Sequence, residues 1–559
     1  MNKIFKISML SALLLSTIGC KKDFLIEKPN AIIAPDNLYV NKAGFESGLN
    51  GLYNLLRQER RGIAAPTNDI TNTAAMIGVD NAYSLYPAGG AAESVFNDFG
   101  VRLTPTNGYI SSFFIYLYRT INAANTIINR AENPAINWTP AEKNQIVAEA
   151  RLIRAWTYRH LTYLWGDVPL NLEESSGDNI KTDWERAPVA DVRKAMEDDL
   201  LFAEANLPDV AQVEGKLSKV VAQHYLAELY LTIGENQKAK DKALAVTQNP
   251  NYNLITARYG TEATKPGTAF TDMFIDKNSN RSEGNKEALF VFQNEYLSIG
   301  GDANIMRRWW VNRYNTIRVG GKTPITYSKE NGGRGLGRFA ATKYALALYG
   351  PGDDRGSYHA WRFFWIMNNP SSLPAGMQAN ATCTSPGWTG PKLGDTVKLS
   401  INCSEPNPSA SSAQNWPNTR KWDWAPDDPS DVQNSSGFND QVYLRLAETY
   451  LLLAEAQMKL NDAGGAAITI NALRNRAHAT TIDAADVNMN FILDERSREL
   501  FSEEHRRYTL IRTGTWFART QQYNKFTGPK IILRDTLLPI PQSVIDANLA
   551  KPMTQNPGY

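Results

Sequence analysis

The chain is poor in cysteine and histidine, with three Cys and five His among 559 residues. No two histidines stand at the spacing of a zinc-binding H-E-x-x-H helix. A basic block is also missing, because 59 Lys and Arg nearly cancel 57 Asp and Glu to a net charge of +2. Since nucleic-acid binding usually needs a basic patch, we expect no nucleic-acid partner. We expect no metal and no cofactor, although structural Ca²⁺ at acidic pairs such as Asp353-Asp354 or Asp427-Asp428 stays open.

Long apolar runs are scarce too, and the clearest one, Ile7 to Ile18, lies at the N-terminus after Lys3 and Lys6. It is shorter than the roughly 20 residues of a membrane span, and its basic start is typical of a signal peptide. We therefore assign residues 1–19 to a signal peptide. The run ends in Thr17-Ile18-Gly19-Cys20, which resembles a lipobox, so we predict lipid on Cys20 and a tether over 20–30. An ordinary signal peptide with an incidental cysteine is the alternative.

The two remaining cysteines are Cys383 and Cys403, on either side of a stretch rich in Ser, Pro and Gly. In an oxidising exported compartment, two such thiols more often pair than stay free. A disulfide closing this loop would contribute roughly 3 kcal/mol in the chain-entropy model. Neither cysteine has a second ligand at zinc spacing, so we predict a disulfide.

Apolar residues recur at helical spacing in the first half of the chain. The ranges that we expect to be helical are 113–132, 141–165, 191–206 and 217–233. Thr139 before Pro140, with Glu142 following, is a typical helix start.

A degenerate repeat supports a particular helical architecture. Ala227-x2-Tyr230-x3-Gly234-x4-Ala239-x3-Ala243 has the spacing of a tetratricopeptide unit, and a weaker copy runs from Ala454 to Ile470. Because such units must stack to bury their faces, we expect the helices before 250 and after 440 to pack together. The fold class is therefore mostly α, a tetratricopeptide-like helical scaffold.

The composition changes between about 251 and 440, where Gly, Pro, Ser, Asn and aromatics crowd together with short strand-like runs such as Ala288 to Phe292. Long irregular stretches in compact proteins are usually functional. We divide the mature chain into a helical region (31–250), an irregular, aromatic-rich insertion lobe (251–440) and a second helical region (441–559), and expect the ligand site in the lobe.

Several motifs, in the same order, resemble the SusD/RagB family along the whole chain. They are KDFL at 22–25, EARLIRA at 149–155, WGDVPL at 165–170, LRLAETYLLLAEA at 444–456, DERSRELFSEEHRR at 494–507, LPIP at 538–541 and TQNPGY at 554–559. The resemblance implies a tetratricopeptide-like scaffold with an irregular ligand lobe. It also implies an outer-membrane lipoprotein that faces the cell exterior and acts as a lid on a SusC-type TonB-dependent transporter.

Members of that family capture oligosaccharides, or in some cases peptides, and are not enzymes. The resemblance therefore implies glycan binding without catalysis, with peptide binding as the alternative. A secreted glycoside hydrolase is a weaker rival, because sequence neighbours such as Asp353 and Asp354 give no evidence of two carboxylates facing each other across a sugar.

Two segments combine aromatic rings with polar side chains, the combination that small-ligand sites use. The lobe segment offers Tyr296, Trp309, Trp310, Asn312, Arg313 and Tyr314. The turn-rich segment before the first long helix offers Asn81, Tyr83 and Tyr86, in a region where the family carries part of its glycan site. For each set the alternative is structural: packed core for the tryptophans and a solvated loop for residues 78–87.

The charged motif around Asp494 to Arg512 alternates signs along one predicted helix, which favours a structural role through ion pairs. We expect His505 to be a packed histidine and not a general base. The glycine-rich run Gly332 to Gly337 lacks the Lys-Ser/Thr of a phosphate loop, so we expect a flexible surface turn.

Overall fold

The computed structural model describes residues 34–61, 70–85, 94–177, 179–296, 298, 300–301, 303–319, 321–373, 396–398, 416–425 and 432–559. Cys20, Tyr86, Cys383, Cys403, Asp427 and Asp428 lie outside these ranges, so the predictions that involve them stay predictions. Within the described ranges, every helix is either too short or too polar to serve as a membrane span.

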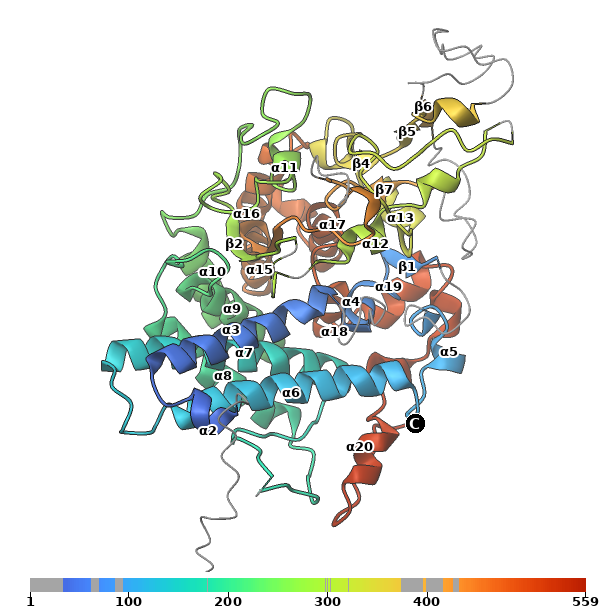
Figure 1. Cartoon of the computed structure of the whole chain (residues 1–559). Helices are drawn as coiled ribbons and strands as arrows, with labels where there is room; N and C mark the ends of the chain where they lie inside the picture. The colour runs from blue at the N-terminus through green and yellow to red at the C-terminus, as the bar shows by residue number, and fades with distance from the viewer. Residues whose placement is uncertain are drawn as a thin grey trace, which may run out of the picture.

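The helices before residue 250 form the lower part of the molecule in Figure 1. They are α2 (Pro35–Leu38), α3 (Lys42–Arg61), α4 (Ile70–Met76), α5 (Phe99–Arg102), α6 (Gly108–Arg130), α7 (Pro140–Trp165), α8 (Val189–Asn206), α9 (Lys219–Ile233) and α10 (Asn236–Thr247). The predicted start of α7 is confirmed: Thr139 Oγ1 accepts from the Glu142 amide, and Glu142 Oε2 accepts from the Thr139 amide at 2.8 Å. This reciprocal pair satisfies two otherwise orphaned backbone donors.

The helices after residue 440 are α15 (Leu446–Lys459), α16 (Ala463–Arg476), α17 (Met489–Leu500), α18 (Arg506–Arg512), α19 (Trp516–Tyr523) and α20 (Gln542–Ala547). Both tetratricopeptide-like units are confirmed as helix pairs, α9 with α10 and α15 with α16. The first pair turns at Gly234, whose left-handed φ of 83° suits glycine.

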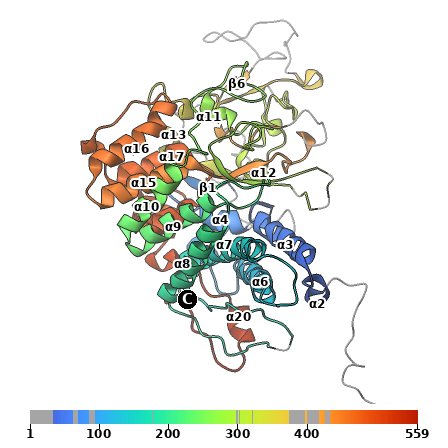
Figure 2. The same ribbon diagram turned by 90° about the vertical axis from the view of Figure 1, so that its left-hand side faces the viewer.

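The predicted packing of the two helical regions is also confirmed, since α15 lies against both α9 and α10. Figure 2 shows these helices side by side on one flank of the molecule. A hydrogen bond of 2.8 Å between His224 Nδ1 and Thr449 Oγ1 joins α9 to α15 inside the core. The helical regions before residue 250 and after residue 440 thus form one scaffold.

The lobe between the two helical regions is built from short elements. Its helices are α11 (Ala269–Asp272), α12 (Met306–Trp310) and α13 (Lys343–Ala347), and its strands are β2 (Ala288–Phe292), β3 (Phe339–Ala341), β4 (Trp361–Arg362), β5 (Phe364–Ile366), β6 (Thr396–Lys398) and β7 (Asn418–Thr419). Strand β2, predicted from sequence, pairs antiparallel with β8 (Gln441–Arg445), which leads directly into α15. The boundaries near 250 and 440 stay predictions.

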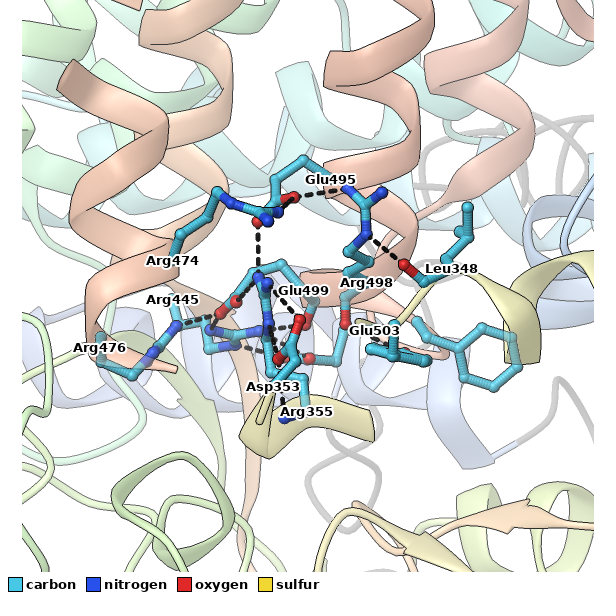
Figure 3. A network of polar contacts seen from close by, with 12 residues as sticks. Leu348, Asp353, Arg355, Arg445, Arg474, Arg476, Glu495, Arg498, Glu499 and Glu503 are labelled. Atoms are coloured by element: carbon cyan, nitrogen blue, oxygen red, sulfur yellow. Dashed lines mark hydrogen bonds and ion pairs between the residues drawn. The ribbon is translucent and has the colours of Figure 1, made fainter. Parts of the chain in front are cut away.

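A network of buried ion pairs fastens the lobe to the scaffold (Figure 3). Glu499 on α17 accepts from Arg445 at 2.6 Å, from Arg355 at 3.0 Å and from Arg476. Arg355 comes from the lobe, Arg445 from β8 and Arg476 from α16. Burial would raise the pKa of Glu499, but the three arginines lower it. The predicted structural role of the charged motif is therefore confirmed, but its prediction as one helix is wrong, because α17 ends at Leu500 and α18 begins at Arg506.

His505 belongs to a similar buried contact. Its Nδ1 lies 2.8 Å from Arg159 Nη1, and its Nε2 contacts Glu59. Because an arginine can only donate, Nδ1 accepts and Nε2 carries the proton toward Glu59. The histidine is packed, as predicted.

One loop prediction is wrong. Gly332, Gly333 and Gly335 are buried, and a Cβ on Gly335 would lie 2.0 Å from the carbonyl oxygen of Val311. The run is glycine-rich because the backbone passes too close to its neighbours for side chains, and not because it forms a flexible surface turn.

Candidate functional site

The structure brings together the two segments that the sequence singled out. Strand β1 (Ala82–Ser84) pairs antiparallel with β3, so that Ser84 lies opposite Phe339. The ring of Trp309 stacks on Phe339 with centroids 5.2 Å apart. Residues more than 220 positions apart thus share one junction of β1, β3 and α12.

The side chains at this junction are buried, however. Trp309, Trp310 and Tyr83 expose almost no surface. Trp310 packs edge-on against Phe339 and Phe501, and Tyr83 packs against Phe526. A sugar could not reach these rings without displacing protein, so their position does not support ligand contact. Both tryptophans, on the five-residue helix α12, belong to the core, which was the structural alternative for them.

The neighbouring predicted residues are structural in the same way. Asn81 donates from Nδ2 to Ser497 Oγ at 3.0 Å, and Asn312 donates to the carbonyl of Trp416. Tyr314 is buried, donates to the carbonyl of Gly333 and stacks on Trp365. Arg313 is partly exposed beside them.

Among the predicted aromatic residues that the structure describes, Tyr296 is the one that reaches the surface. Its side chain is 39% exposed, and its ring meets Phe438 edge-on with centroids 4.6 Å apart. Asn294, two residues earlier, donates from Nδ2 to the Asn439 carbonyl at 3.0 Å. Tyr296 therefore lies against the segment 437–442, which contains Phe438.

That segment closes a small pocket, here called the lobe pocket. Its walls come from segments 273–279, 304–307, 421–424 and 437–442, and its volume is about 30 Å³. Aromatic walls are given by Phe274, Trp422 and Trp424, of which Trp424 is half-buried. A cavity of 10–15 Å³ holds about one water, so the pocket admits a hydroxyl or hydroxymethyl group but not a whole sugar ring.

Amide groups without partners line the lobe pocket. Gln441 is 2% exposed, and neither its Oε1 nor its Nε2 has a hydrogen-bond partner among the described residues. Nδ2 of Asn439 is likewise unpartnered within the described part of the chain. Because burying such groups without a bond costs about 1–3 kcal/mol each, these amides can bond the hydroxyl of a ligand or a water molecule that enters the pocket.

The charged groups of the lobe pocket are held in place by the protein. Asp440 accepts from the Asn294 amide at 2.8 Å and from Asn280 Nδ2 at 2.7 Å, and burial raises its pKa. Burial lowers the pKa of Lys421 to about 8, although Lys421 donates to Glu503. Arg307 donates to the carbonyl of Ser436 at 2.9 Å.

This arrangement suits binding. Aromatic faces border amides, as in sites for small polar ligands. Asp440 is the one carboxylate among the lining residues, whereas glycoside hydrolysis needs a facing pair. Across the described residues, His, Cys, Asp and Glu side chains do not gather in the groups of three that would suit a metal ion. Of the acidic pair Asp353-Asp354, Asp353 binds Arg355 and Asp354 contacts His478 at 2.8 Å.

The sequence candidates include none of the residues that line the lobe pocket, such as Trp422, Trp424, Asn439 and Gln441. The available signal was the alternation Trp422-x-Trp424, which is typical of an extended segment with two rings on one side.

Comparison with protein families gives two matches. Residues 270–559 match the SusD family, and residues 35–231 match a family described as "Starch-binding associating with outer membrane". Among curated proteins, SusD-like protein P2 and SusD-like protein P25 of Formosa agariphila are each 26% identical to this chain, over the full length of both partners.

Solved structures share the fold. A "Laminarin binding SusD-like protein" superimposes with a TM-score of 0.67 at 20% identity, over 93% of this chain and 100% of its own. A SusD homolog from Bacteroides thetaiotaomicron gives a TM-score of 0.69 at 18% identity, over 94% of this chain and 98% of its own. These likenesses confirm the predicted tetratricopeptide-like fold class.

Proposed function

This chain belongs to the SusD family, and we propose that it captures glycans at the cell surface and delivers them to a SusC-type TonB-dependent transporter. The observation that carries the proposal is the family match over 270–559, which contains every segment of the lobe pocket. The laminarin-binding protein of the same fold supports a glycan as the ligand.

The lobe pocket supports the same class of ligand. A sugar ring at its mouth would meet the half-buried Trp424, while one exocyclic hydroxyl would enter and bond to the amides of Gln441 and Asn439. Tyr296 and Phe438 extend this surface on the side of Asn439. Binding without catalysis fits the single carboxylate, Asp440, which is occupied by Asn280 and Asn294.

Anchoring is part of the proposal. The N-terminal match is to a family described as associating with the outer membrane. Lipid on Cys20, with residues 20–30 as a leash, would hold the protein there, facing outward. The partner that receives the glycan is the transporter barrel, which the family implies.

The test is retention of the purified protein on a panel of insoluble polysaccharides, followed by calorimetry with soluble fragments of laminarin and starch. We expect binding to at least one glycan, and at least tenfold weaker binding for Trp424→Ala. The matched control is Trp138→Ala, a half-buried tryptophan that packs on Phe45 in the helical region and should leave binding unchanged.

Two results would replace the proposal. Retention on peptide mixtures but on no glycan would establish the peptide-binding alternative. Release of shorter sugars from a glycan, abolished by one carboxylate substitution, would establish a hydrolase.

A further inference from the structure

A second pocket, here called the scaffold pocket, lies in the helical region before residue 250. Its volume is about 330 Å³, against about 30 Å³ for the lobe pocket. Its walls come from α3, α7 and the segment 208–217, and α3 packs directly against α7 (Figures 1 and 2). Pockets that hold whole small molecules begin at roughly 300 Å³. The scaffold pocket is therefore large enough for a ligand of its own.

A buried carboxylate, Glu149 of α7, lines the scaffold pocket. The residue is 4% exposed, and its Oε2 accepts from the Tyr53 hydroxyl at 2.5 Å. That hydroxyl accepts in turn from the Leu217 amide at 2.8 Å, which fixes its direction. Lys216 Nζ lies 3.6 Å from the same carboxylate oxygen. The other oxygen, Oε1, therefore has no hydrogen-bond partner among the described residues.

The charge of Glu149 is incompletely compensated. Burial raises the pKa of Glu149 by more than Lys216 and Tyr53 lower it. Lys216 is also shared with other groups, because its Nζ donates to Asn50 Oδ1 at 3.3 Å and lies over the ring of Tyr53. Since a cation close to a buried carboxylate favours its charged form, a further cation in the scaffold pocket would stabilise Glu149.

The remaining charged groups of the scaffold pocket leave this need unmet. Lys42 binds Glu142 at 2.7 Å and lies 3.9 Å from Glu46, and all three side chains are more exposed than Glu149. Together with Glu149 and Lys216, the lining contains three carboxylates and two lysines. The excess of one negative charge favours a cationic ligand over an anionic one.

The other walls of the scaffold pocket are aliphatic. Leu49, Ile146 and Leu217 are buried there, and Val213 is 62% exposed. Aromatic side chains are missing among the described residues that line this pocket, in contrast to the lobe pocket. A sugar face would therefore find no ring to stack on, whereas an aliphatic chain would find apolar contacts.

We propose that the scaffold pocket is a second binding site, for a small molecule that carries a primary ammonium group on an aliphatic body. The ammonium group donates to Oε1 of Glu149, and the aliphatic body packs on Leu49 and Ile146. This inference goes beyond glycan capture and does not depend on it, because the two pockets share no lining residue.

The experiment titrates the purified protein with three probes and measures binding by ligand-observed NMR. The probes are n-pentylamine, its neutral counterpart 1-pentanol, and methylamine, which carries the charge without the chain. We expect n-pentylamine to bind at least tenfold more tightly than either of the others. Its affinity should fall as the pH is lowered, and the fall should be centred above pH 4.5, because the pKa of Glu149 is raised above that value.

Two pairs of variants locate the site. Glu149→Gln, whose amide oxygen can still accept from Tyr53, should weaken n-pentylamine binding at least tenfold and abolish the pH dependence. Glu46→Gln removes the same charge from a side chain that is 55% exposed and should weaken binding at most about twofold. Val213→Trp fills the pocket without touching its buried carboxylate, and Val101→Trp on α5 is its control, since Val101 is 73% exposed and lies outside the pocket.

Thermal unfolding and glycan retention are measured for every variant, and neither should change for Val213→Trp. Equal affinities for n-pentylamine and 1-pentanol would overturn the inference, as would equal losses for Glu149→Gln and Glu46→Gln. Glucose binding that Glu149→Gln and Val213→Trp abolish would overturn it in favour of a second sugar site. A wild type that retains glycan but binds none of the probes overturns this inference alone.

Discussion

Two buried polar regions of this chain are built in opposite ways. Around Glu499, each oxygen of a buried carboxylate meets an arginine, and three different segments supply those arginines. In the lobe pocket, Gln441 is equally buried, yet its amide has no partner among the described residues. A fully hydrogen-bonded network stabilises the fold, whereas an unpartnered polar group in a pocket is available to bond a molecule that enters the pocket. The charged motif that contains Glu499, the most recognisable in the sequence, therefore has a structural role.

The largest effect should follow from breaking the satisfied region. Glu499→Gln removes the charge that compensates Arg355, Arg445 and Arg476, and we expect it to lower the free energy of unfolding by about 3–5 kcal/mol. Urea denaturation followed by circular dichroism measures this. Glu132→Gln, at an exposed pair with Lys143, should cost at most about 1 kcal/mol. Equal losses for both variants would contradict the role of the network.

Low pH should weaken another buried ion pair between a carboxylate and an arginine, the one between Glu228 and Arg159. Glu228 is buried, and burial alone would raise its pKa, but Arg159, with smaller contributions from Arg512 and His224, lowers the pKa from 4.5 to about 2. Because the folded pKa lies below the unfolded one, this stabilisation is complete above pH 4.5 and is lost as the pH falls toward 2. At about 1.4 kcal/mol per pKa unit, the loss is about 3 kcal/mol.

The measurement is the free energy of unfolding in urea at several pH values between 7 and 2. Glu228→Gln, which cannot titrate, should flatten the dependence below pH 4.5, since that side chain no longer binds a proton on unfolding. Wild-type and variant curves of the same slope would show that Glu228 does not contribute.

Removing the unpartnered amide from the lobe pocket should raise the stability of the protein and weaken glycan binding. Gln441→Leu removes the unpartnered amide, so we expect the free energy of unfolding to rise by about 1 kcal/mol. Glycan affinity should fall about tenfold, or 1.4 kcal/mol, measured by calorimetry. The matched control is Gln457→Leu on α15: Gln457 is also buried, but its Oε1 accepts from Thr469 at 2.7 Å. That variant should lose stability and keep its affinity.

Much of the scaffold could be predicted from the sequence because its signals are local. Helical spacing, the Thr139–Glu142 cap and the small residues around Gly234 each act within a few turns of chain. The packing of the two helical regions also followed, because repeat units cannot bury their faces alone.

Apart from the alternation Trp422-x-Trp424, the lobe pocket could not be predicted, because its walls come from segments that span 273 to 442 and share no local pattern. Composition likewise cannot distinguish a buried aromatic from an exposed one: Trp309 and Trp310 pack on Phe339, while Tyr296 reaches the surface. The prediction of a flexible surface turn at Gly332 to Gly337 was wrong for the same reason. The close backbone approach that requires glycine there depends on a separate segment around Val311.

The smallest expected effect tests whether every exposed aromatic ring of the lobe contributes to glycan binding, or only the rings beside the lobe pocket. Tyr296→Ala should weaken glycan binding about three- to fivefold and change the free energy of unfolding by less than about 0.5 kcal/mol, because the ring is partly exposed and contacts Phe438 alone among the ring contacts of the described residues. Tyr358, which is 50% exposed and packs on His359 and Phe364, provides the comparison. If Tyr358→Ala weakens binding as much as Tyr296→Ala, the glycan lies across the lobe surface and the amides of Gln441 and Asn439 do not direct it. If only Tyr296→Ala weakens glycan binding, the sugar ring lies over the segment 437–442, where one of its hydroxyls can reach those amides.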